Sequence, residues 1–377
     1  MNIAIIVHLF PNLSETFILN QITGLLDMGH HVEIFAGFNP KQEKIHPDVL
    51  KYNLLQRTHY LPEGKIKLIL NSLYLLLTNF HKSPINLLRT LNIFRYRKVG
   101  LVLRLLQTLI HLMEMDFDII HCHYGTNGVV GAYLKEMGIK GKIVTSFHGY
   151  DMSSFVVSSG YEVYRHLFLF GDLFLPISDY WEKKLIELGC DEKRIVVHRM
   201  GIDVNKFKYC EKKIKSGEPI NILSVGRLVE KKGYEYAFKS IARIAKTRKY
   251  IEYLVAGEGS LKETLACLIS ELGIEKNSKL LGELSRDEII KLYEEAHIFI
   301  LASVTANDND QEGIPVVLME AQAVGLPIVS THHTGIPEVV SDGKSGFLVP
   351  ERDEDALVEK LQYLIEHPEL WPEMGRY

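Results

Sequence analysis

The chain has 377 residues, of which 46% are hydrophobic and 24% are charged, and its formal net charge is −4. This ordinary globular composition excludes wholesale disorder and collagen-like or coiled-coil architectures, and the length predicts two domains. Four scattered cysteines without a CxxC pair exclude a disulfide framework and indicate a reducing compartment. With this charge, and with no basic stripe interleaved with aromatic residues, nucleic acid is not an expected partner.

The first residues and the apolar runs indicate a cytoplasmic protein. Residues 1–7 have no basic region and no small-residue cleavage site, so they are not expected to form a signal peptide. No apolar run reaches the roughly 18 residues that cross a bilayer. The longest candidate, residues 68–80, is interrupted by polar side chains.

Short apolar runs alternate with segments of helical periodicity in both halves of the chain. The runs that predict strands are residues 3–9, 31–36, 118–122, 143–147, 173–177 and 195–198, then 222–225, 253–256, 279–281, 298–301 and 328–330. Helices are predicted over 15–28 and, with a capping box, over 285–296. Strand–helix alternation indicates parallel sheets with right-handed crossovers. The two series therefore predict an α/β protein of two doubly wound, Rossmann-like domains facing across a cleft.

A polar, Lys-rich stretch marks the predicted domain boundary. Residues 206–219 lack apolar periodicity and form the predicted linker between an N-terminal domain, residues 1–205, and a C-terminal domain, residues 220–377. Ligands of open α/β sheets bind beyond the carboxyl ends of the strands, so the cleft is the expected site.

Residues 64–113 break the pattern of alternation. They are Leu-rich, helical in period, and carry eight basic residues and no acidic one. One interpretation is a set of helices packed on the N-terminal domain, with Lys and Arg in solvent. The other is a membrane-surface patch whose cations meet anionic lipid. The residues alone leave both interpretations open.

The segment 311–327 carries the most information about chemistry. Pro315 suits the first position of a short helix and Gly325 its C′ position. The backbone N–H groups at the start of such a helix bind anions, of which phosphate is the expected one. The N–H groups concerned belong to Gly313, Ile314 and Val316.

Two carboxylates, Glu312 and Glu320, accompany this helix. Eight helical positions span on the order of 12 Å, which argues against a glycosidase pair, whose carboxyl groups lie ~5 to ~9.5 Å apart. Carboxylates are also good acceptors for sugar and ribose hydroxyls. Taken alone, Glu320 is equally explained as a solvated helix residue.

Two turns that contain glycine follow predicted strands of the second half. In the first, Gly226 permits close backbone approach, and Arg227 and Lys232 can converge on a diphosphate. The alternative is an ordinary turn with two surface cations. The second turn holds Gly257 and Gly259, which suits a nucleotide. The phosphate loop GxxxxGK[ST] and the full GxGxxG fingerprint are both absent.

Histidines give one site candidate and no predicted metal site. His148 ends a predicted strand and would face the cleft, although a structural histidine is the alternative. His121 and His123 share a strand face but have no third ligand nearby in sequence, and His332 with His333 is expected to be a loop pair.

Together these segments resemble the GT-B-fold retaining glycosyltransferases of family 4, group 1. The resemblance runs through the chain and is densest over residues 222–349, with Val225-Gly-Arg…Glu-Lys-Lys-Gly233, Ala256-Gly-Glu-Gly259, the two glutamates with seven residues between them, and Gly346-Phe-Leu-Val. His148 within Phe-His-Gly matches the family's N-domain histidine. Residues 10–18 with 310–315 resemble the subgroup that builds exopolysaccharides such as colanic acid and amylovoran.

The resemblance implies transfer of a sugar, with retention, from a UDP- or GDP-sugar to a glycan or lipid-linked acceptor, with no metal or other cofactor. The Leu-rich, basic residues 64–113 fit a lipid-linked acceptor at the inner membrane face, where the protein would be peripheral. The site residues that the resemblance implies are Arg227, Lys232 and the N–H groups of Gly313–Val316 for the diphosphate, with the turns at Gly226, Gly257 and Gly259; Glu312 for the donor sugar and Glu320 for the ribose; Leu281 and Gly282 for the base; and His148 for the donor sugar or the path of the departing proton.

Two departures from the family pattern keep other functions open. Where many members carry a Gly-rich loop after the first strand, this chain has Pro11–Thr16, in which Ser14 or Thr16 would supply donors. The chain ends at Tyr377, before the last helix with which relatives usually return to the first domain, so weaker interdomain stability is expected. A catalytically inactive nucleotide-sugar-binding module is therefore an alternative. A dehydrogenase or epimerase is a third, against which the missing fingerprint argues.

Overall fold

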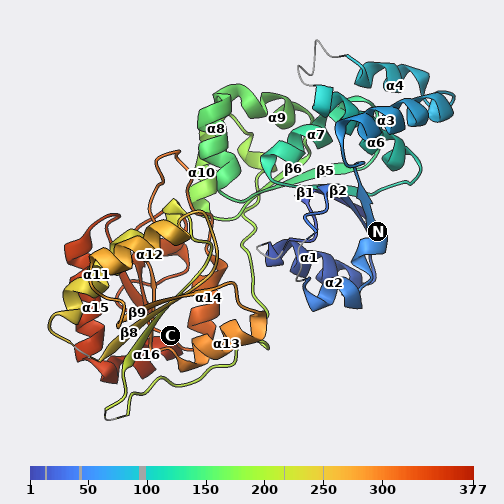
Figure 1. Ribbon diagram of the computed structural model, residues 1–377. Helices are drawn as coiled ribbons and strands as arrows, with labels where there is room; N and C mark the ends of the chain where they lie inside the picture. The colour runs from blue at the N-terminus through green and yellow to red at the C-terminus, as the bar shows by residue number, and fades with distance from the viewer. Residues whose placement is uncertain (13–14, 42–44, 93–98, 216, 249) are drawn as a thin grey trace. The chain divides into compact units, whose positions relative to one another are not determined.

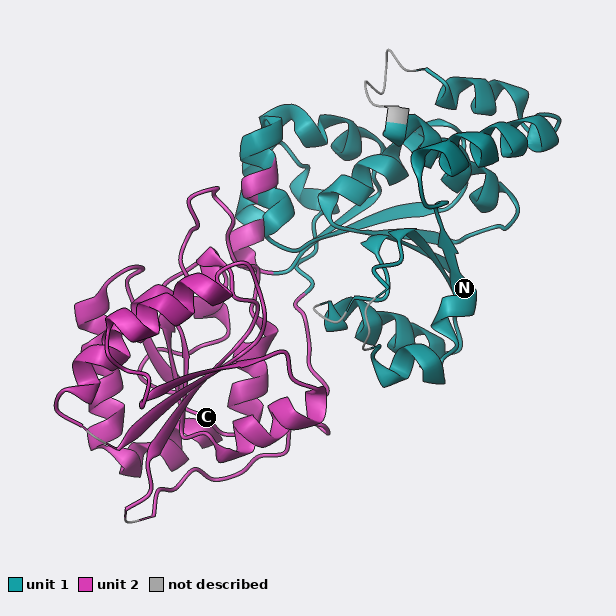
Figure 2. Ribbon diagram, viewed as in Figure 1, with its two compact units in different colours: residues 1–152, 156–177, 182–198 teal, residues 153–155, 178–181, 199–377 magenta. Residues whose placement is uncertain are grey.

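The computed structural model describes residues 1–12, 15–41, 45–92, 99–215, 217–248 and 250–377. Contacts divide the chain into two compact units (Figure 2). The first unit contains residues 1–152, 156–177 and 182–198, and the second contains 153–155, 178–181 and 199–377. The continuous part of the second unit thus begins before the predicted linker.

The first unit is built on a parallel sheet with six strands among the described residues (Figure 1). Its strands are β1 (Asn2–Leu9), β2 (His31–Phe38), β3 (Thr58–Tyr60), β4 (Ile119–His123), β5 (Lys142–Phe147) and β6 (Leu173–Pro176). They lie in the order β3-β2-β1-β4-β5-β6. The order reverses between β1 and β4, where Ile5 of β1 pairs with Ile34 on one side and with His121 on the other.

Helices cover both faces of this sheet. Those between residues 16 and 187 are α1 (Thr16–Asp27), α2 (Pro47–Lys51), α3 (Lys65–Asn79), α4 (Pro84–Thr90), α6 (Val99–Met113), α7 (Gly125–Glu136), α8 (Ser154–Ser159), α9 (Arg165–Phe170) and α10 (Asp179–Glu187). Ile22 of α1 packs with Ile34 in one buried cluster. Leu105 and Leu109 of α6 pack with Ile120 in another. Apolar periodicity thus directs these helices onto the sheet.

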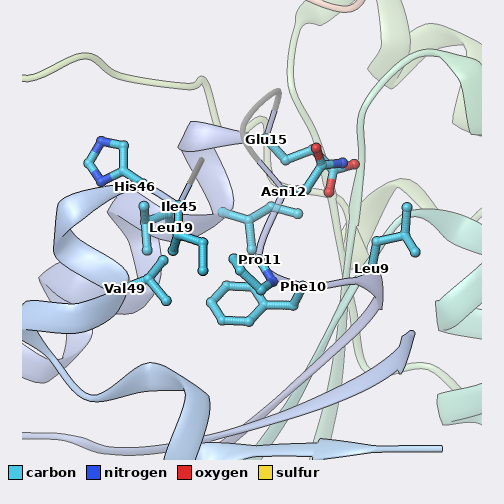
Figure 3. Close-up of a pocket in the computed structure, with 10 residues that line it drawn as sticks. Leu9, Phe10, Pro11, Asn12, Glu15, Leu19, Ile45, His46 and Val49 are labelled. Carbon is cyan, nitrogen blue, oxygen red and sulfur yellow. The ribbon is translucent and has the colours of Figure 1, made fainter. Parts of the chain in front are cut away.

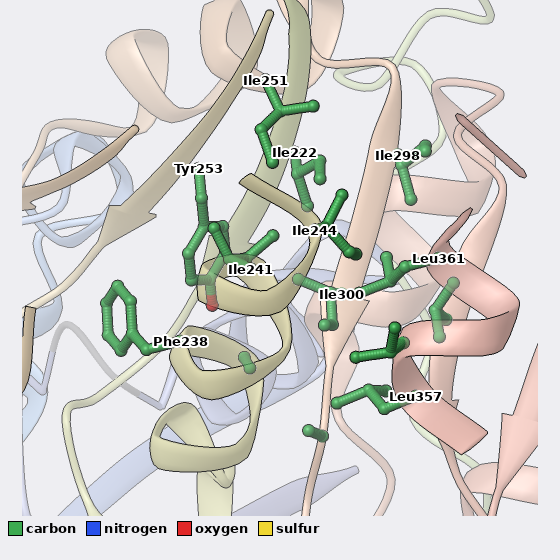
Figure 4. Close-up of a cluster of buried hydrophobic side chains, with 14 of the residues drawn as sticks. Ile222, Phe238, Ile241, Ile244, Ile251, Tyr253, Ile298, Ile300, Leu357 and Leu361 are labelled. Carbon is green, nitrogen blue, oxygen red and sulfur yellow. The ribbon is translucent and has the colours of Figure 1, made fainter. Parts of the chain in front are cut away.

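The second unit repeats the scheme with a second parallel sheet, again of six strands within the described part of the chain. Its strands are β7 (Ile220–Val225), β8 (Ile251–Ala256), β9 (Ser278–Gly282), β10 (Ile298–Leu301), β11 (Ile328–Thr331) and β12 (Gly346–Val349), in the order β12-β11-β10-β7-β8-β9. Its helices are α11 (Tyr234–Ala245), α12 (Lys262–Glu271), α13 (Arg286–Glu295), α14 (Val316–Ala323), α15 (Glu354–Glu366) and α16 (Trp371–Arg376). On one face, Ile241 of α11 and Leu361 of α15 meet Ile222 and Ile300 of the sheet (Figure 4).

The local signals for helix ends are confirmed with one adjustment. Ser285 and Glu288 form the predicted capping box at the start of α13. Gly325 follows α14 with a φ of +89°, as a C′ glycine does. Pro315 precedes α14 rather than opening it, because its ψ of 110° is extended.

Three short strands were predicted wrongly or missed. The predicted strand at 195–198 is wrong, since Ile195 makes a single bridge to Phe174. The edge strands β3 and β12 have three and four residues and were not predicted. Runs this short carry too little periodicity to distinguish a strand from a loop.

The described part of residues 64–113 forms helices packed on the first unit, as one interpretation expects, and the membrane-surface interpretation stays a prediction. α6 is structural, and its one arginine, Arg104, turns inward and donates from Nη2 to Asn127 Oδ1 at 2.8 Å. α3 and α4 pack on α6 and expose their other faces. Within the described residues, no helix combines the length and the apolar character needed to cross a bilayer.

Candidate active site

Most predicted site residues lie beyond the carboxyl ends of strands in the second unit. Gly226 follows β7, Gly257 follows β8, and Gly282 ends β9. The segment that leads to Glu312 follows β10. Because all strands of this sheet are parallel, these segments meet at the same edge, where ligands of α/β sheets bind.

The glycines at this edge are packed against one another. Gly226 N donates to Ala256 O at 2.9 Å, and Gly257 N donates to Gly282 O at 2.8 Å. A Cβ atom at Gly257 would lie 2.0 Å from Gly226 O, and one at Gly259 would lie 2.4 Å from Leu228 O, both in the turn after β7. Chain packing therefore requires glycine at 257 and 259, and their contact with a nucleotide stays a prediction.

The structure joins two predicted site residues in a buried ion pair. Lys232 Nζ lies 2.7 Å from Glu312 Oε1, and both side chains are about nine-tenths buried. Ser303 Oγ donates to the same carboxylate oxygen at 3.3 Å. The aliphatic part of Lys232 passes over Gly226, where a Cβ atom would stand 3.4 Å from Lys232 Cε. The pair therefore connects the β7 turn with the segment before α14.

The charge state of Glu312 follows from these neighbours. Burial by itself would raise the pKa of Glu312, but the ammonium groups of Lys232 and Lys231 outweigh burial and lower that pKa to about 2. Because the folded-state pKa lies below the ordinary value of 4.5, ionised Glu312 contributes stability that is complete above about pH 4.5. That contribution is lost as the pH falls toward 2.

Lys231 is a contributor that the sequence analysis missed. Its side chain is buried, its Nζ lies 2.9 Å from Asp310 Oδ2, and it donates to Gln311 O at 3.1 Å. Lys231 thus holds the short 3₁₀ turn Glu230–Lys232 against the segment before Glu312. The only signal for Lys231 in the sequence was that two lysines are adjacent, which does not indicate the groups that they contact.

His333 is a second missed contributor. Glu312 N donates to His333 Nε2 at 3.1 Å, and His333 Nδ1 lies 2.6 Å from Glu351 Oε1. Nε2 must therefore carry a lone pair and Nδ1 the proton, an assignment made from the hydrogen-bond network. Both histidines lie in the loop after β11, as predicted, but His332 is exposed whereas His333 is 1% exposed.

Replacing His333 with alanine is expected to lower the free energy of unfolding by about 1–3 kcal/mol, because the buried N–H of Glu312 loses its acceptor. Urea unfolding followed by circular dichroism measures this change. His332→Ala is the matched control and is expected to stay within about 0.5 kcal/mol of the parent. Equal losses in both variants would contradict the positioning role of His333.

Arg227 stands apart from this network. Its side chain is exposed and makes no hydrogen bond or ion pair with any described residue. A guanidinium in this position binds an anion without breaking an internal contact. This property is what the predicted role of Arg227 on a diphosphate requires.

The start of α14 offers N–H groups as predicted. Within the described part of the chain, the N–H groups of Gly313, Ile314 and Val316 have no hydrogen-bond acceptor. N–H groups at a helix start attract negative charge, and the helix dipole adds to this attraction. Their contact with phosphate stays a prediction.

Glu320 lies inside α14 and is buried, so the alternative of a solvated helix residue is wrong. Tyr293 Oη donates to Glu320 Oε2 at 3.1 Å, and Arg286 Nη2 lies 4.0 Å from Glu320 Oε1. Burial raises the pKa of Glu320, with Arg286 and Tyr293 opposing it. The two glutamates thus have pKa values shifted in opposite directions. A ribose contact of Glu320 stays a prediction, as does a base contact of half-buried Leu281 and Gly282.

His148 lies in the first unit, directly after β5. The buried carboxylate of Asp151 accepts hydrogen bonds from the N–H groups of His148 at 2.9 Å, Gly149 at 3.1 Å and Gly125 at 2.7 Å. Burial raises the pKa of Asp151 to about 6 despite these bonds. Asp151 therefore fixes the turn that carries His148.

The ring of His148 belongs to a stack of histidines. His148 Nε2 lies 3.2 Å from His123 Nδ1, and His123 stacks on His121. Burial, with His121 and His198, lowers the pKa of His148 to about 3. A neutral ring at pH 7 suits a hydrogen bond to substrate better than proton abstraction. No group of three or more metal-ligating side chains suited to a metal ion occurs within the described ranges.

The predicted loop after β1 is only partly described. Thr16 begins α1, whose next residue, Phe17, packs its ring 4.8 Å from that of His148. Ser14 lies outside the described residues. The preceding loop, residues 10–12, borders a mainly apolar cavity of about 10 Å³ (Figure 3). That volume holds about one water and is too small for a nucleotide.

Comparisons with known proteins agree with this geometry. The model of Glycosyltransferase Family 4 matches residues 14–206, and that of Glycosyl transferases group 1 matches residues 205–377. The chain is 40% identical over 369 residues to the putative colanic acid biosynthesis glycosyltransferase WcaL of Escherichia coli, covering 96% of this chain and 90% of that protein. It is 39% identical over 358 residues to the amylovoran biosynthesis glycosyltransferase AmsK of Erwinia amylovora, covering 92% and 86%.

Solved structures show the same fold at low sequence identity. Anabaena Alr3699/HepE in complex with UDP and glucose has a TM-score of 0.71 at 17% identity, covering 100% of this chain and 92% of that one. Sucrose-phosphate synthase from Thermosynechococcus elongatus has a TM-score of 0.74 at 17% identity, with the same coverage. The predicted GT-B fold of two Rossmann-like domains is confirmed, and the chain belongs to the group 1 glycosyltransferases of family 4.

Proposed function

We propose that this protein transfers a sugar from a UDP- or GDP-sugar to a glycan or lipid-linked oligosaccharide during exopolysaccharide or cell-surface polysaccharide synthesis. The observation that carries the proposal is the buried Lys232–Glu312 pair at the carboxyl edge of the second sheet, with Arg227, which has no partner among the described residues, in the same segment after β7 as Lys232. The names of the relatives, which refer to colanic acid and amylovoran biosynthesis, support the class of product.

The proposed chemistry centres on the leaving group. As the diphosphate departs from an oxocarbenium-like sugar, negative charge builds on its β-phosphate. Fixed cations and N–H dipoles at that phosphate lower the barrier most, because they are in place before the charge develops. We assign this role to Arg227, Lys232 and the N–H groups of residues 313–316. Such a cradle takes the place of a divalent metal, so the proposed reaction is metal-independent, and its retaining stereochemistry follows the family resemblance.

The Lys232–Glu312 pair is proposed to prepare the site for the donor. Lys232 passes over Gly226, so its ammonium lies where the β7 turn meets Glu312. Glu312 is ionised at neutral pH and accepts hydrogen bonds only. Hydroxyls of the donor sugar are the donors that such a carboxylate needs. A bound diphosphate would share the charge of Lys232 with Glu312.

Thermal unfolding with nucleotides tests the donor class. We expect either UDP or GDP to raise the melting temperature, with and without EDTA, because a ligand that binds the native state stabilises it. ADP and NAD are the matched controls. A shift with NAD alone would support a dehydrogenase, and loss of the UDP or GDP shift in EDTA would contradict metal independence.

The alternative of a non-catalytic nucleotide-sugar-binding module has no support in the comparisons. It predicts binding of UDP or GDP without any turnover of the donor. Release of UDP or GDP from the matching nucleotide sugar, measured with and without a polysaccharide-precursor lipid, separates the two functions. Release of UDP or GDP from one particular nucleotide sugar, and not from others, supports the transferase.

We expect His148→Ala to slow transfer about tenfold, the effect of about one lost hydrogen bond to substrate. Because the pKa of His148 is about 3, its ring does not titrate between pH 6 and 8. The pH profiles of the variant and the parent should therefore run parallel in that range. Full transfer activity in the variant would remove His148 from the proposed catalytic residues.

A lipid-linked acceptor would place the enzyme at a membrane surface. We therefore propose that it acts as a peripheral protein on the inner face of the membrane. The basic, Leu-rich segment 64–113 supports this location.

A further inference from the structure

The helices α3 and α4 each turn large apolar side chains outward. The exposed side chains of this α3–α4 face are Ile66, Ile69, Leu70, Leu73, Tyr74 and Leu77 of α3 and Ile85 and Leu88 of α4, each between 51% and 75% exposed. Spacings of three and four residues place those of α3 along one side of the helix. Both helices pack on α6 at one end of the first unit (Figure 1). Exposed apolar side chains gathered along one side of a helix in this way mark an interaction site.

α3 carries large apolar side chains on its outward side as well as on the side toward α6. The residues of α3 that are fully buried are the polar Ser72 and Asn79. Ser72 Oγ accepts a hydrogen bond from Gln107 Nε2 of α6 at 2.8 Å. A surface helix of a globular protein normally buries its apolar side and exposes its polar side. α3 is held on α6 by this hydrogen bond and by Leu75 and Leu76, which pack against the cluster that contains Leu105, while most of its other large apolar side chains face outward.

Unpaired cations border the apolar side chains. Lys65, Lys67 and Arg89 are exposed and form no ion pair with any described residue. Lys65 and Lys67 lie in the first turn of α3, where positive charge is unfavourable with respect to the helix dipole. They therefore do not stabilise the helix itself. The sequence from Gly64 to Met113 holds no acidic residue that could neutralise them.

We propose that the α3–α4 face docks on the surface of a bilayer that contains anionic lipid. In this arrangement the exposed Leu and Ile side chains enter the boundary between headgroups and acyl chains, and the cations meet lipid phosphates. A second copy of this chain is a poorer occupant, because a two-fold contact would bring the same unpaired cations together. This proposal rests on the proposed function, since docking would bring the enzyme to its lipid-linked acceptor. Vesicle binding requires no sugar transfer, so the docking proposal and the transferase proposal can each fail without the other.

Sedimentation of the full chain with vesicles tests this proposal. We expect the protein to pellet with mixed phosphatidylglycerol–phosphatidylcholine vesicles at low salt, and several-fold less at high salt or with phosphatidylcholine alone. Leu70→Glu/Leu73→Glu should bind at least tenfold more weakly. Leu169→Glu on α9 is the matched control, since Leu169 is 72% exposed in the same unit. Lys65→Gln/Lys67→Gln should bind several-fold more weakly, unlike Lys140→Gln/Lys276→Gln, which removes two exposed lysines elsewhere.

Other outcomes would overturn the proposal. They are absence of binding to anionic vesicles at low salt, equal binding of Leu70→Glu/Leu73→Glu and the parent, and equal binding to vesicles with and without anionic lipid. A dimer that this double variant converts to a monomer, with no vesicle binding by either, would assign the face to a second copy. An unchanged melting temperature and nucleotide shift would show that the variant is folded and that its donor site is intact.

Discussion

Arg227→Ala is expected to remove roughly 2–4 kcal/mol of transition-state stabilisation, which is a loss of about thirtyfold to about a thousandfold in kcat/KM. The reason is that Arg227 is proposed to face the charge that develops on the leaving diphosphate. Its side chain has no partner among the described residues, so its removal should leave the melting temperature unchanged. Steady-state transfer or donor-cleavage assays, with thermal unfolding alongside, measure both effects.

One further variant separates the charge of Arg227 from its shape, and a second serves as a control. Arg227→Lys keeps a positive charge but loses the planar fork that binds a phosphate through two N–H groups, so an intermediate loss is expected. Arg243→Ala, on α11 of the same unit, removes an exposed arginine whose partner is the exposed Asp355, and it should change activity little. Near-parental turnover of Arg227→Ala would refute its assignment to the diphosphate.

Lys232→Met is expected to lower the free energy of unfolding by about 3–5 kcal/mol and to abolish measurable transfer. The substitution leaves the carboxylate of Glu312 buried without its nearest counter-charge, 2.7 Å away in the parent. Breaking one half of a buried ion pair costs more than the intact pair contributes. Urea unfolding gives the change in stability. Lys239→Met, which breaks partly exposed pairs with Glu235 and Glu354, is the control and should cost no more than about 1 kcal/mol.

The double variant Lys232→Met/Glu312→Gln separates stability from catalysis. It removes both buried charges, so most of the lost stability should return, while transfer should stay abolished because both proposed donor contacts are gone. If the double variant were no more stable than Lys232→Met, the buried charge of Glu312 would not be the cause of the loss.

The pH dependence of the single variant provides a second check. In the parent, Lys232 is the strongest of the charges that lower the pKa of Glu312 to about 2. Without Lys232, burial is opposed less, so the folded-state pKa of Glu312 rises. With a raised pKa, Glu312 of the variant takes up a proton as the pH falls, and this removes the unfavourable buried charge from the folded state. The stability gap between the variant and the parent should therefore be largest near pH 7 and shrink toward pH 4.5.

Much of the fold follows from short-range patterns. A strand buried on both faces, such as β10 (Ile298–Leu301), appears as an uninterrupted apolar run because it has no solvent-facing side. The capping box at Ser285 and the C′ glycine at Gly325 depend on residues within a few positions of each other. Patterns of this range also placed the glycine turns at the ends of strands and Glu312 just before the short helix.

The contacts that give the candidate site its electrostatics do not follow from such patterns. Lys232 meets Glu312, and His333 meets Glu351, only because β7, β10, β11 and β12 end at the same sheet edge. Two neighbouring lysines, or two neighbouring histidines, look equivalent in a sequence. In the folded chain Lys231 meets Asp310 and Lys232 meets Glu312, whereas of the two histidines only His333 turns inward to a carboxylate. These partners lower the pKa of Glu312 and of Glu351.

Apolar periodicity and turn residues were thus sufficient for the two series of parallel strands and for the motifs at their ends, since these signals act over a few residues. The partners of Lys231, Lys232 and His333 depended on folding, because charges separated along the chain interact only when the sheet brings them together. The outward direction of the α3–α4 face had the same origin. A helical period is compatible with either side of a helix being buried, and α6 covered the side of α3 that carries Ser72, Leu75 and Leu76.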